Sequence, residues 1–427
     1  MMAAWERAKL GDLVETQKGY AFKSGWYCDS GRPIVKVSNF TDDSIDSTTL
    51  VCIPESIATD YLKYEIRAGD VVVQTVGSWP NNPASVVGKC VRTPRHAARA
   101  LLNQNAVKLS PADCFNRTFL FYLLRNEDFK TYIIGTAQGA ASQAAITLEA
   151  IRCYEFELPP LPTQCKIAAI LSAYDDLIEN NLRRIKILEE MAQNLYREWF
   201  VKFRFPGWEK ARFVDSPVGR IPEGWEVVSF TDIADVLSGG TPKTAVPEYW
   251  GGEIPFFAPK DTPASFFVTE TEKRITELGL SKCNSKFYPP LTIFITARGT
   301  VGKVVMPAVA MAMNQSCYAL RGKPGISQTF LFLATLEQVT YLKKNTGGAT
   351  FDTIVVDTFH RMQVIRPEDT IVVNFTDHVE SIFGMILNLI KRSTTLRRTR
   401  DLLLPKLISG EVDVSELDIA VPEEATA

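Results

Sequence analysis

Two stretches of the chain contain lysine and arginine but no aspartate or glutamate. The first stretch runs from Val71 to Ala112 and the second from Leu278 to Leu336. Clustered lysine and arginine bind phosphate groups, and nearby carboxylates would oppose that binding. A net charge of -2 argues against a uniformly basic protein. The two stretches nevertheless favour contact with DNA or RNA, and the alternative is a pair of apolar sheets that carry few acids.

Within and beside these stretches we expect certain side chains to contact nucleic acid. Lysine and arginine would mainly hold phosphates, whereas arginine can read guanine and asparagine or glutamine can read adenine in the major groove. The two Asn-Gln pairs have an equally acceptable second interpretation, a turn that precedes a strand and hydrogen-bonds its own backbone. The predicted DNA-binding residues are Lys89, Arg92, Arg95, Arg99, Asn103, Gln104, Lys282, Lys286, Arg298, Lys303, Asn314 and Gln315.

The sequence contains no pattern typical of catalysis or of metal binding. The three histidines lack metal-ligand spacing, and the eight cysteines include no C-x-x-C pair. Around Arg298–Lys303, Ala297 and Val304 stand where a P-loop needs Gly and Ser or Thr. A G-x-S-x-G elbow is missing, and so is the [DN]-P-P-[YFW] run of an adenine methyltransferase. We therefore predict a binding role, with no catalytic residue and no cofactor or metal in this chain.

The two basic stretches occupy matching places in an internal repeat. Thr118-Phe119-Leu120-Phe121 recurs as Thr329-Phe330-Leu331-Phe332, and Val87-Gly88-Lys89 recurs as Val301-Gly302-Lys303. The period is about half the chain, whereas solenoid repeats span roughly 20–50 residues. The pattern indicates a duplicated module of mixed helix and strand, with a helix expected over 116–131. The first copy carries an extra loop, residues 78–84, that the second copy lacks.

Each copy is followed by a segment that predicts a long helix. From Thr163 to about Lys202 no proline or glycine occurs and apolar residues fall at heptad spacing, while Gly384, Ser393 and Arg400 interrupt the second pattern. We expect the two stripes to cover each other as an antiparallel coiled coil, because neither is stable in water alone. The alternative is that each helix packs on its own domain. The seam residues are Ile167, Leu171, Tyr174, Ile178, Asn181, Ile185, Leu188 and Leu195, then Phe375, Val379, Ile382, Ile386, Leu389, Leu396 and Leu403.

These observations predict an α+β fold: two similar globular domains separated by two long helices that form an antiparallel coiled coil, with pseudo-two-fold symmetry. The composition, 46% hydrophobic and 22% charged, is that of an ordinary globular protein. No apolar run approaches the roughly 18 residues that a membrane span needs, so we expect a cytoplasmic protein. The expected parts are domains at 1–160 and 223–367, helices at 161–202 and 368–408, a linker at 203–222 and an acidic tail at 409–427.

Along its whole length the chain resembles the specificity subunit of type I restriction-modification systems, HsdS. The resemblance is carried by ILSAYDDLIENN at 170–181, LYREWF at 195–200 with FRFPG at 203–207, DSPVGRIPEGW at 215–225 and LPKLISGEV at 404–412. The first copy departs from the family's Arg-Gly loop, since Gly77-Ser78 and an insertion replace Arg298-Gly299.

The resemblance implies two target recognition domains, each reading one half of a bipartite, asymmetric site on double-stranded DNA. It implies that the long helices act as a spacer and dock two HsdM methyltransferase subunits, which bring S-adenosylmethionine and methylate adenine. HsdR restriction subunits can join that complex. A coiled-coil scaffold protein without sequence-specific DNA binding is the main alternative; it explains the helices but not the paired basic stretches.

Overall fold

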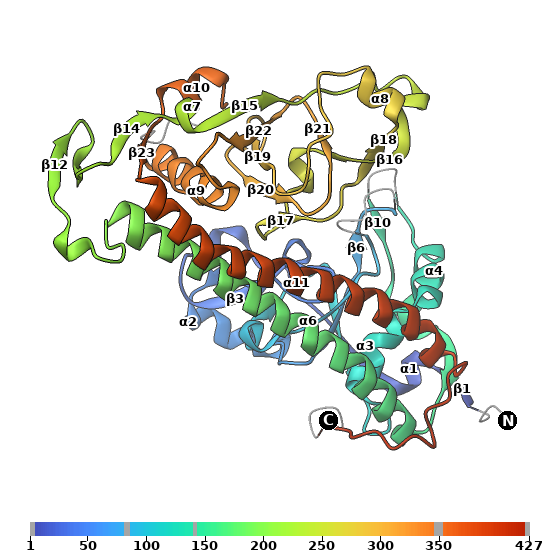
Figure 1. Ribbon diagram of the computed structural model, residues 1–427. Coiled ribbons are helices and arrows are strands. Elements are labelled where there is room, and N and C mark those ends of the chain that lie inside the picture. The colour runs from blue at the N-terminus through green and yellow to red at the C-terminus, as the bar shows by residue number, and fades with distance from the viewer. Residues whose placement is uncertain (1–4, 81–85, 140–142, 346–352, 423–427) are drawn as a thin grey trace. The chain divides into compact units, whose positions relative to one another are not determined.

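The computed structural model describes residues 5–80, 86–139, 143–345 and 353–422 and divides into two compact units (Figure 1). Unit 1 comprises Met1–Ile178 with Thr395–Ala427, and unit 2 comprises Glu179–Thr394. Each unit holds one globular domain, called domain 1 or domain 2, together with half of each long helix. Part of the expected extra loop and the end of the acidic tail lie outside the described residues. Within the described part, no helix has the length and apolar character that crossing a membrane requires.

Domain 1 is built on two small sheets. Its strands are β1 (Glu6–Lys9), β2 (Val14–Lys18), β3 (Arg32–Val35), β4 (Val51–Ile53), β5 (Val71–Gln74), β6 (Val76–Gly77), β7 (Cys90–Arg92), β8 (Leu101–Leu102), β9 (Ala106–Pro111), β10 (Ala144–Ala145) and β11 (Glu155–Leu158). One sheet has the antiparallel order β2-β9-β5-β7, and the other has the order β4-β3-β8 with β3 and β8 parallel. β1 pairs with β11, which brings the start and the end of the domain together.

Domain 2 repeats this plan. Its strands are β14 (Glu226–Ser229), β15 (Ala234–Ser238), β16 (Trp250–Phe257), β17 (Phe267–Val268), β18 (Lys273–Ile275), β19 (Ile293–Thr296), β20 (Val304–Pro307), β21 (Ala312–Met313), β22 (Cys317–Gly322) and β23 (Gln363–Arg366). The orders β15-β22-β19-β20-β17 and β18-β16-β21 match those of domain 1 strand for strand, with β17 added at one edge. β14 pairs with β23 as β1 pairs with β11. The duplication seen in the sequence is therefore a duplication of topology.

The short helices lie between and beside these strands. In unit 1 they are α1 (Leu10–Leu13), α2 (Glu55–Ala58), α3 (Arg117–Arg125), α4 (Glu127–Gly135) and α5 (Leu148–Arg152). In unit 2 they are α7 (Phe230–Ile233), α8 (Glu277–Ser281), α9 (Gln328–Asn345) and α10 (Val356–Arg361), and the hairpin of β12 (Phe213–Ser216) and β13 (Gly219–Pro222) precedes domain 2. The repeated Thr-Phe-Leu-Phe run forms part of α3 and of α9, where Phe119 and Phe330 are buried against the sheets.

The single helix predicted over 116–131 is wrong in one respect, because the structure has two helices there. Asn126 has an extended backbone conformation, with ψ at 149°, between α3 and α4. Its side chain accepts a hydrogen bond from the backbone N–H of Glu127 and so caps the start of α4. Asparagine is a favoured N-cap residue because its side-chain oxygen replaces a missing helical acceptor. The apolar pattern continues through the break and hides it.

Two long helices join the domains. α6 spans Leu161–Tyr196 and ends in a π-helical turn at Arg197–Val201, and α11 spans Asp369–Ile408. In unit 1, Lys166 Nζ of α6 donates to the Ser415 carbonyl just beyond α11, and Asp175 of α6 meets Arg400 of α11. Residue numbers rise along one helix as they fall along the other, so the pairing is antiparallel. The helix halves run side by side within each unit (Figure 1), and the predicted α+β fold with an antiparallel pair of long helices is confirmed.

The predicted seam residues lie at or near this helix pairing. Ile167 and Leu171 share a buried cluster with Leu404 and Leu407 in unit 1. In unit 2, Ile185 shares the core of domain 2 with the seam residues Phe375, Val379, Ile382, Ile386 and Leu389. Ile178 and Asn181 are buried, whereas Tyr174, Leu188, Leu195, Leu396 and Leu403 are half-buried. Ser393 and Arg400, expected to interrupt the apolar seam, are also buried.

An aromatic cluster fixes the helix ends in unit 2. The Phe375 ring lies 4.8 Å from that of Phe200 and 5.5 Å from that of Trp199, measured between centroids. Phe200 in turn packs edge-on against Phe330 of α9 at 5.0 Å. Aromatic pairs in this geometry add to the free energy of burial. The cluster thereby holds both long helices against domain 2.

We expect Phe375→Ala to lower the free energy of unfolding by about 3–5 kcal/mol, because it opens a cavity in a close-packed cluster. Urea unfolding of the full chain followed by tryptophan fluorescence measures the change. Val373→Ala is the matched control on the same helix, since Val373 is 59% exposed, and should change the value by less than about 0.5 kcal/mol. Equal effects of the two substitutions would contradict the assignment.

Candidate nucleic-acid interface

In domain 2 the hairpin loop between β19 and β20 presents exposed cations. Thr296, fully buried at the end of β19, holds the loop closed. Its hydroxyl accepts a hydrogen bond of 2.9 Å from the Lys303 N–H and donates to the Thr300 carbonyl. The Gly302 N–H donates to the Thr296 carbonyl at 2.8 Å. The loop that carries Arg298 and Lys303 is therefore fixed by the buried strand beneath it.

The cations of this loop are available to an anionic ligand. Arg298 and Lys303 are exposed, and among the described residues no carboxylate forms an ion pair with either. Lys343 of α9 reaches the same loop and donates to the Gly302 carbonyl at 3.2 Å. Partial burial, together with the positive charge of Lys303, lowers the pKa of Lys343. An anion such as phosphate bound here would relieve that repulsion.

The matching loop of domain 1 is closed by the same two backbone hydrogen bonds but is longer and differs in charge. The Gly88 N–H donates to the Gln74 carbonyl and the Gln74 N–H to the Lys89 carbonyl, as Gly302, Thr296 and Lys303 do in domain 2. The Lys89 side chain, however, is only 15% exposed and lies 3.9 Å from the Asp42 carboxylate. The two loops thus share the hydrogen bonds at their base and differ in length and in charge.

The two Asn-Gln pairs occupy equivalent turns. The Asn103 N–H donates to the Val35 carbonyl and the Asn314 N–H to the Phe257 carbonyl, each at 2.9 Å. A chain segment passes so close to each turn that a Cβ at Gly19 or Gly239 would lie 2.0 Å from the asparagine carbonyl oxygen. Only glycine tolerates such an approach.

Within these turns the asparagine and the glutamine differ in their surroundings. The Asn314 side chain accepts from the Ser316 N–H at 3.0 Å, which is the turn-forming role. Gln104 and Gln315 are exposed, and Thr241 donates to the Gln315 side chain. The glutamines are therefore the better placed of the two residue types to meet a ligand, and their contact with DNA stays a prediction.

Acids from elsewhere in the chain approach several cations of the acid-free stretches. Lys108 lies 3.8 Å from Asp70 and Arg321 lies 3.3 Å from Asp235. The stretches contain no acids in the sequence, but the fold places acids beside them. Antiparallel strand pairing and turns bring acidic residues from outside each stretch close to its lysines and arginines. Charge along the sequence alone therefore overstates the basic surface.

The other predicted DNA-binding cations are distributed over both domains. Arg92 is half-buried and lies over the Phe121 ring, 5.4 Å from its centroid. Arg95 and Arg99 are exposed around a short 3-10 helix in domain 1, and Arg99 has a φ of 72°. Lys282 and Lys286 are exposed after α8. Among the described residues, no hydrogen bond or ion pair joins these two lysines to the Arg298–Lys303 loop.

A group of aromatic rings covered by lysines in domain 1 was not predicted. Lys36 lies over Tyr27 with its Nζ atom 4.0 Å from the ring centroid, Lys23 lies over Trp26 at 5.3 Å and Lys63 over Tyr64 at 4.9 Å. The Tyr20 ring packs between Tyr61 and Tyr64, at 4.6 Å and 5.3 Å. Tyr20 also follows Gly19, which touches the Asn103 turn. Rings and lysines together suit the sugar, base and phosphate groups of DNA.

Domain 2 has a smaller version of this group. Lys273 lies over Trp250, 5.4 Å from the ring centroid, and the Trp250 indole N–H donates to the Lys243 carbonyl at 3.3 Å. Lys243 follows Gly239 at the same spacing as Lys23 follows Gly19. The recurring Gly-x-x-x-Lys spacing is the sequence signal that could have identified both groups. Only the folded chain brings the aromatic residues to it.

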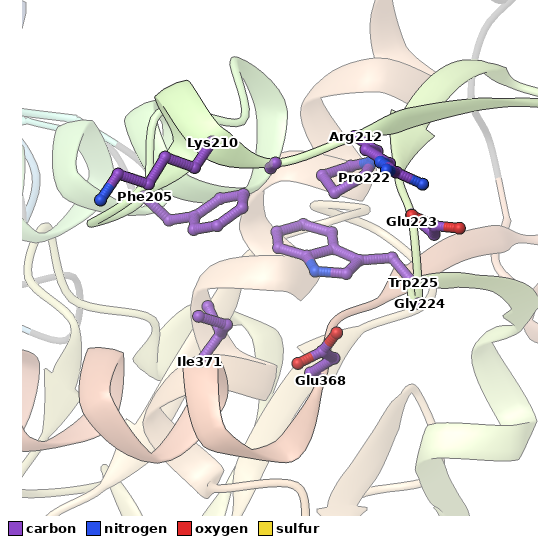
Figure 2. A pocket seen from close by; sticks show the side chains of 10 residues that line it. Phe205, Lys210, Arg212, Pro222, Glu223, Gly224, Trp225, Glu368 and Ile371 are labelled. Atoms are coloured by element: carbon purple, nitrogen blue, oxygen red, sulfur yellow. The ribbon is translucent and has the colours of Figure 1, made fainter.

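A shallow pocket of about 480 Å³ lies in unit 2 where the segment after α6 crosses the start of domain 2. Figure 2 shows the Phe205 ring beside the Trp225 indole, and their centroids are 5.1 Å apart. Lys210, Arg212, Glu223 and Glu368 stand around these rings. The lining holds no cysteine, histidine, serine or threonine, so it offers no hydroxyl, thiol or imidazole nucleophile. We interpret it as part of the joint between linker and domain.

The fold and these surfaces together define a class of protein: a duplicated α+β chain whose two domains share one topology and carry equivalent Asn-Gln turns and exposed cations, joined by paired helices. A family model described as "Type I restriction modification DNA specificity domain" matches residues 2–190 and 222–382. The chain belongs to this family, and each matched segment contains one domain with the first part of the helix that follows it.

Similar proteins agree with this assignment. The chain is 25% identical to the type I restriction enzyme HindI specificity subunit of Haemophilus influenzae, over 96% of this chain and 100% of that protein. It is 29% identical to the MjaIX specificity subunit of Methanocaldococcus jannaschii, over 74% of this chain and 73% of that protein. The crystal structure of the type I restriction-modification S subunit from M. genitalium has the same fold, with a TM-score of 0.55, 14% identity and 95% and 96% coverage.

Two glycines of the domain 2 loop provide a test of how the loop is held. Both have positive φ, but a Cβ at Gly302 would lie 2.9 Å from Val339 Cγ1, whereas a Cβ at Gly299 would meet nothing within 4 Å. Gly299→Ala should cost roughly 1–2 kcal/mol for the left-handed backbone alone. Gly302→Ala should cost more, because it also pushes α9 away. Thermal unfolding of both variants measures the difference, and a Gly302→Ala effect no larger than that of Gly299→Ala would contradict this packing.

Proposed function

We propose that this chain is the DNA-reading subunit of a type I restriction-modification complex and recognises a bipartite, asymmetric site on double-stranded DNA. The observation that carries the proposal is the recurrence, in both domains, of the same Asn-Gln turn and of the same backbone hydrogen bonds at the base of a lysine-bearing loop. Duplex DNA presents equivalent faces at two separated half-sites, and a duplicated reader can meet both. Because the loops differ in charge and the aromatic groups differ in size, the two half-sites can differ in sequence.

The division of labour follows from the chemistry of the side chains. The exposed cations, Arg298 and Lys303 of domain 2 foremost, hold phosphates and set the register of the domain that carries them. Gln104 and Gln315 are the candidates for reading adenine edges. Residues 1–160 and 223–367 act as the two target recognition domains, while the helices at 161–202 and 368–408 fix the spacing between half-sites and 203–222 connects them. The tail at 409–427 is not part of the reader.

The catalytic chemistry belongs to partner subunits. Two HsdM-type methyltransferase subunits dock on the helices and bring S-adenosylmethionine, while this chain itself binds no cofactor and catalyses nothing. HsdR-type restriction subunits can join the complex. A scaffold without DNA specificity would not require the Asn-Gln turn and the backbone hydrogen bonds of the adjoining loop to be built twice, and the family assignment does not favour it.

The DNA-contact part of this proposal is tested by the salt dependence of binding. For the complex with its methyltransferase partner, Arg298→Ala should lower DNA affinity and reduce the slope of log K against log salt by about 0.9, because one phosphate fewer is neutralised. Arg321→Ala is the matched control, because Arg321 is paired with Asp235. An unchanged slope for Arg298→Ala would remove this loop from the interface. Loss of methylation when the wild-type chain is omitted tests the role of the subunit itself.

A further inference from the structure

The two long helices can be aligned residue by residue through the repeat. Leu158-Pro159 precedes α6 as Arg366-Pro367 precedes α11, and the helices begin at Leu161 and Asp369. A shift of 208 positions therefore converts an α6 residue into its α11 counterpart. The buried positions coincide under this shift; the pairs include Ile167 with Phe375, Leu171 with Val379, Ile178 with Ile386, Ile185 with Ser393 and Trp199 with Leu407.

At one buried position the counterparts differ in charge. Arg400 of α11 is 5% exposed and its guanidinium lies 2.5 Å from the Asp175 carboxylate of α6 in unit 1. Tyr122 of α3 donates to the other oxygen of Asp175, and Asp43 lies 3.7 Å from Arg400. Burial opposes the charge on Arg400, but the charges and hydrogen bonds of Asp175 and Asp401 together outweigh it and raise the arginine pKa. Domain 1 thus holds α11 through an enclosed ion pair.

In unit 2 the same pair of positions is apolar. The α6 counterpart of Arg400 is Ala192, and the α11 counterpart of Asp175 is Phe383. Both are buried in the core of domain 2, where Phe383 packs edge-on against Phe332 at 5.7 Å. The helix pairing is therefore charged at this position in one unit and apolar in the other.

A second contact distinguishes the helices in unit 2. Glu189 of α6 accepts hydrogen bonds from the Ser265 hydroxyl at 2.6 Å and from the Phe266 N–H at 2.8 Å. Burial raises its pKa, although these two hydrogen bonds oppose the rise. The α11 counterpart of Glu189 is Arg397, which is exposed and can only donate. Domain 2 thus holds α6 through an acceptor that α11 does not possess.

We propose that Arg400 and Glu189 make the helix pairing selective. Domain 1 accepts the C-terminal part of α11 and rejects the C-terminal part of α6 from a second chain. Domain 2 accepts the C-terminal part of α6 and rejects the C-terminal part of α11 from a second chain. Two α6 helices paired in the observed register would place Asp175 opposite Ala192. Two α11 helices would place Arg400 opposite Phe383. Each wrong pairing takes a buried ion away from its main partner, because Asp175 would lose Arg400 and Arg400 would keep only Asp401 of its own helix. Such a loss is strongly unfavourable.

The need for such selection follows from the duplication. The apolar seams match, so hydrophobic burial alone does not distinguish an α6–α11 pair from a pair of two α6 helices or two α11 helices. Domain 1 and α6 are also synthesised before α11 exists. Pairing of like halves would give a dimer with two copies of one reading domain. The selection rests on contacts inside each unit and does not depend on DNA binding.

The ion pair is tested by a double-mutant cycle on the full chain. Arg400→Ala and Asp175→Phe install the counterpart residues of unit 2 one at a time and together. Each single variant should increase the unfolding equilibrium constant by about 100-fold or more, because it removes the main ion-pair partner of a buried charge. The double variant should return to within about tenfold of the wild type, since it reproduces the apolar pair. A double variant as unstable as the two singles combined would overturn the proposal.

Partner selection is tested by co-expressing two full-length chains that carry different affinity tags. Capture through one tag should recover only background amounts of the other wild-type chain. When both chains carry Asp175→Phe and Arg400→Ala, we expect to recover at least about tenfold more of the second chain. Pairing of like helices then no longer buries a charged residue away from its ion-pair partner. Equal recovery for the wild type and the double variant would overturn the selective role.

The Glu189 contact gives an independent test that does not depend on the folding of the double variant. Glu189→Arg installs the α11 counterpart and should lower the urea midpoint of the full chain clearly. Glu189→Gln is the matched control, because the amide oxygen still accepts from Ser265 and Phe266, and its midpoint should stay near that of the wild type. Equal midpoints for Glu189→Arg and Glu189→Gln would exclude this contact as a discriminator.

Discussion

The structure depends on one constraint: each long helix carries an apolar stripe that must be covered along its length. A helix of this length is not stabilised by its own hydrogen bonds when its stripe faces water. Each unit satisfies the constraint by packing half of α6 against half of α11 and both against a globular domain, as the shared clusters of Ile167 with Leu407 and of Ile185 with Leu389 show. In each unit the domain and the helix pair therefore share a hydrophobic core. A change in the helix pairing would change the apolar contacts that the domain makes with the helices.

The duplication preserves the backbone and varies the side chains. The hydrogen bonds that close the loops at Lys89 and Lys303 are the same, yet one lysine is largely buried near Asp42 and the other is exposed. The turns at Asn103 and Asn314 are reached by an equivalent glycine, yet the aromatic rings that follow differ in number and kind. A reader of two unlike half-sites needs this combination, because a common frame keeps both domains in the same relation to their helices while the exposed residues differ.

The sequence predicts the repeat, the long helices and their antiparallel pairing, because these depend on residue periodicity that survives without knowledge of contacts. It does not predict the break at Asn126, where a single capping residue interrupts an unbroken apolar pattern. It also misjudges the acid-free stretches, because Asp70 and Asp235 return to Lys108 and Arg321 only when the sheets form. The sequence does not predict the lysines over Trp26 and Tyr27 for the same reason. Lys36 and Tyr27 come together only in the folded chain and belong to no recognisable motif.

One residue that looked like a fault in the second heptad pattern, Arg400, has a physical explanation in the fold. A seam made only of leucine, isoleucine and valine would be more stable and less selective, since such side chains pack against one another in many combinations. Arg400 is tolerated in the seam because Asp175, Asp43 and Asp401 surround its guanidinium, and its burial is favourable only beside those carboxylates. A polar residue in an apolar seam lowers stability for every pairing except the one that satisfies it. In a chain whose halves are copies of each other, that difference in stability favours the α6–α11 pair over a pair of two α6 helices or two α11 helices.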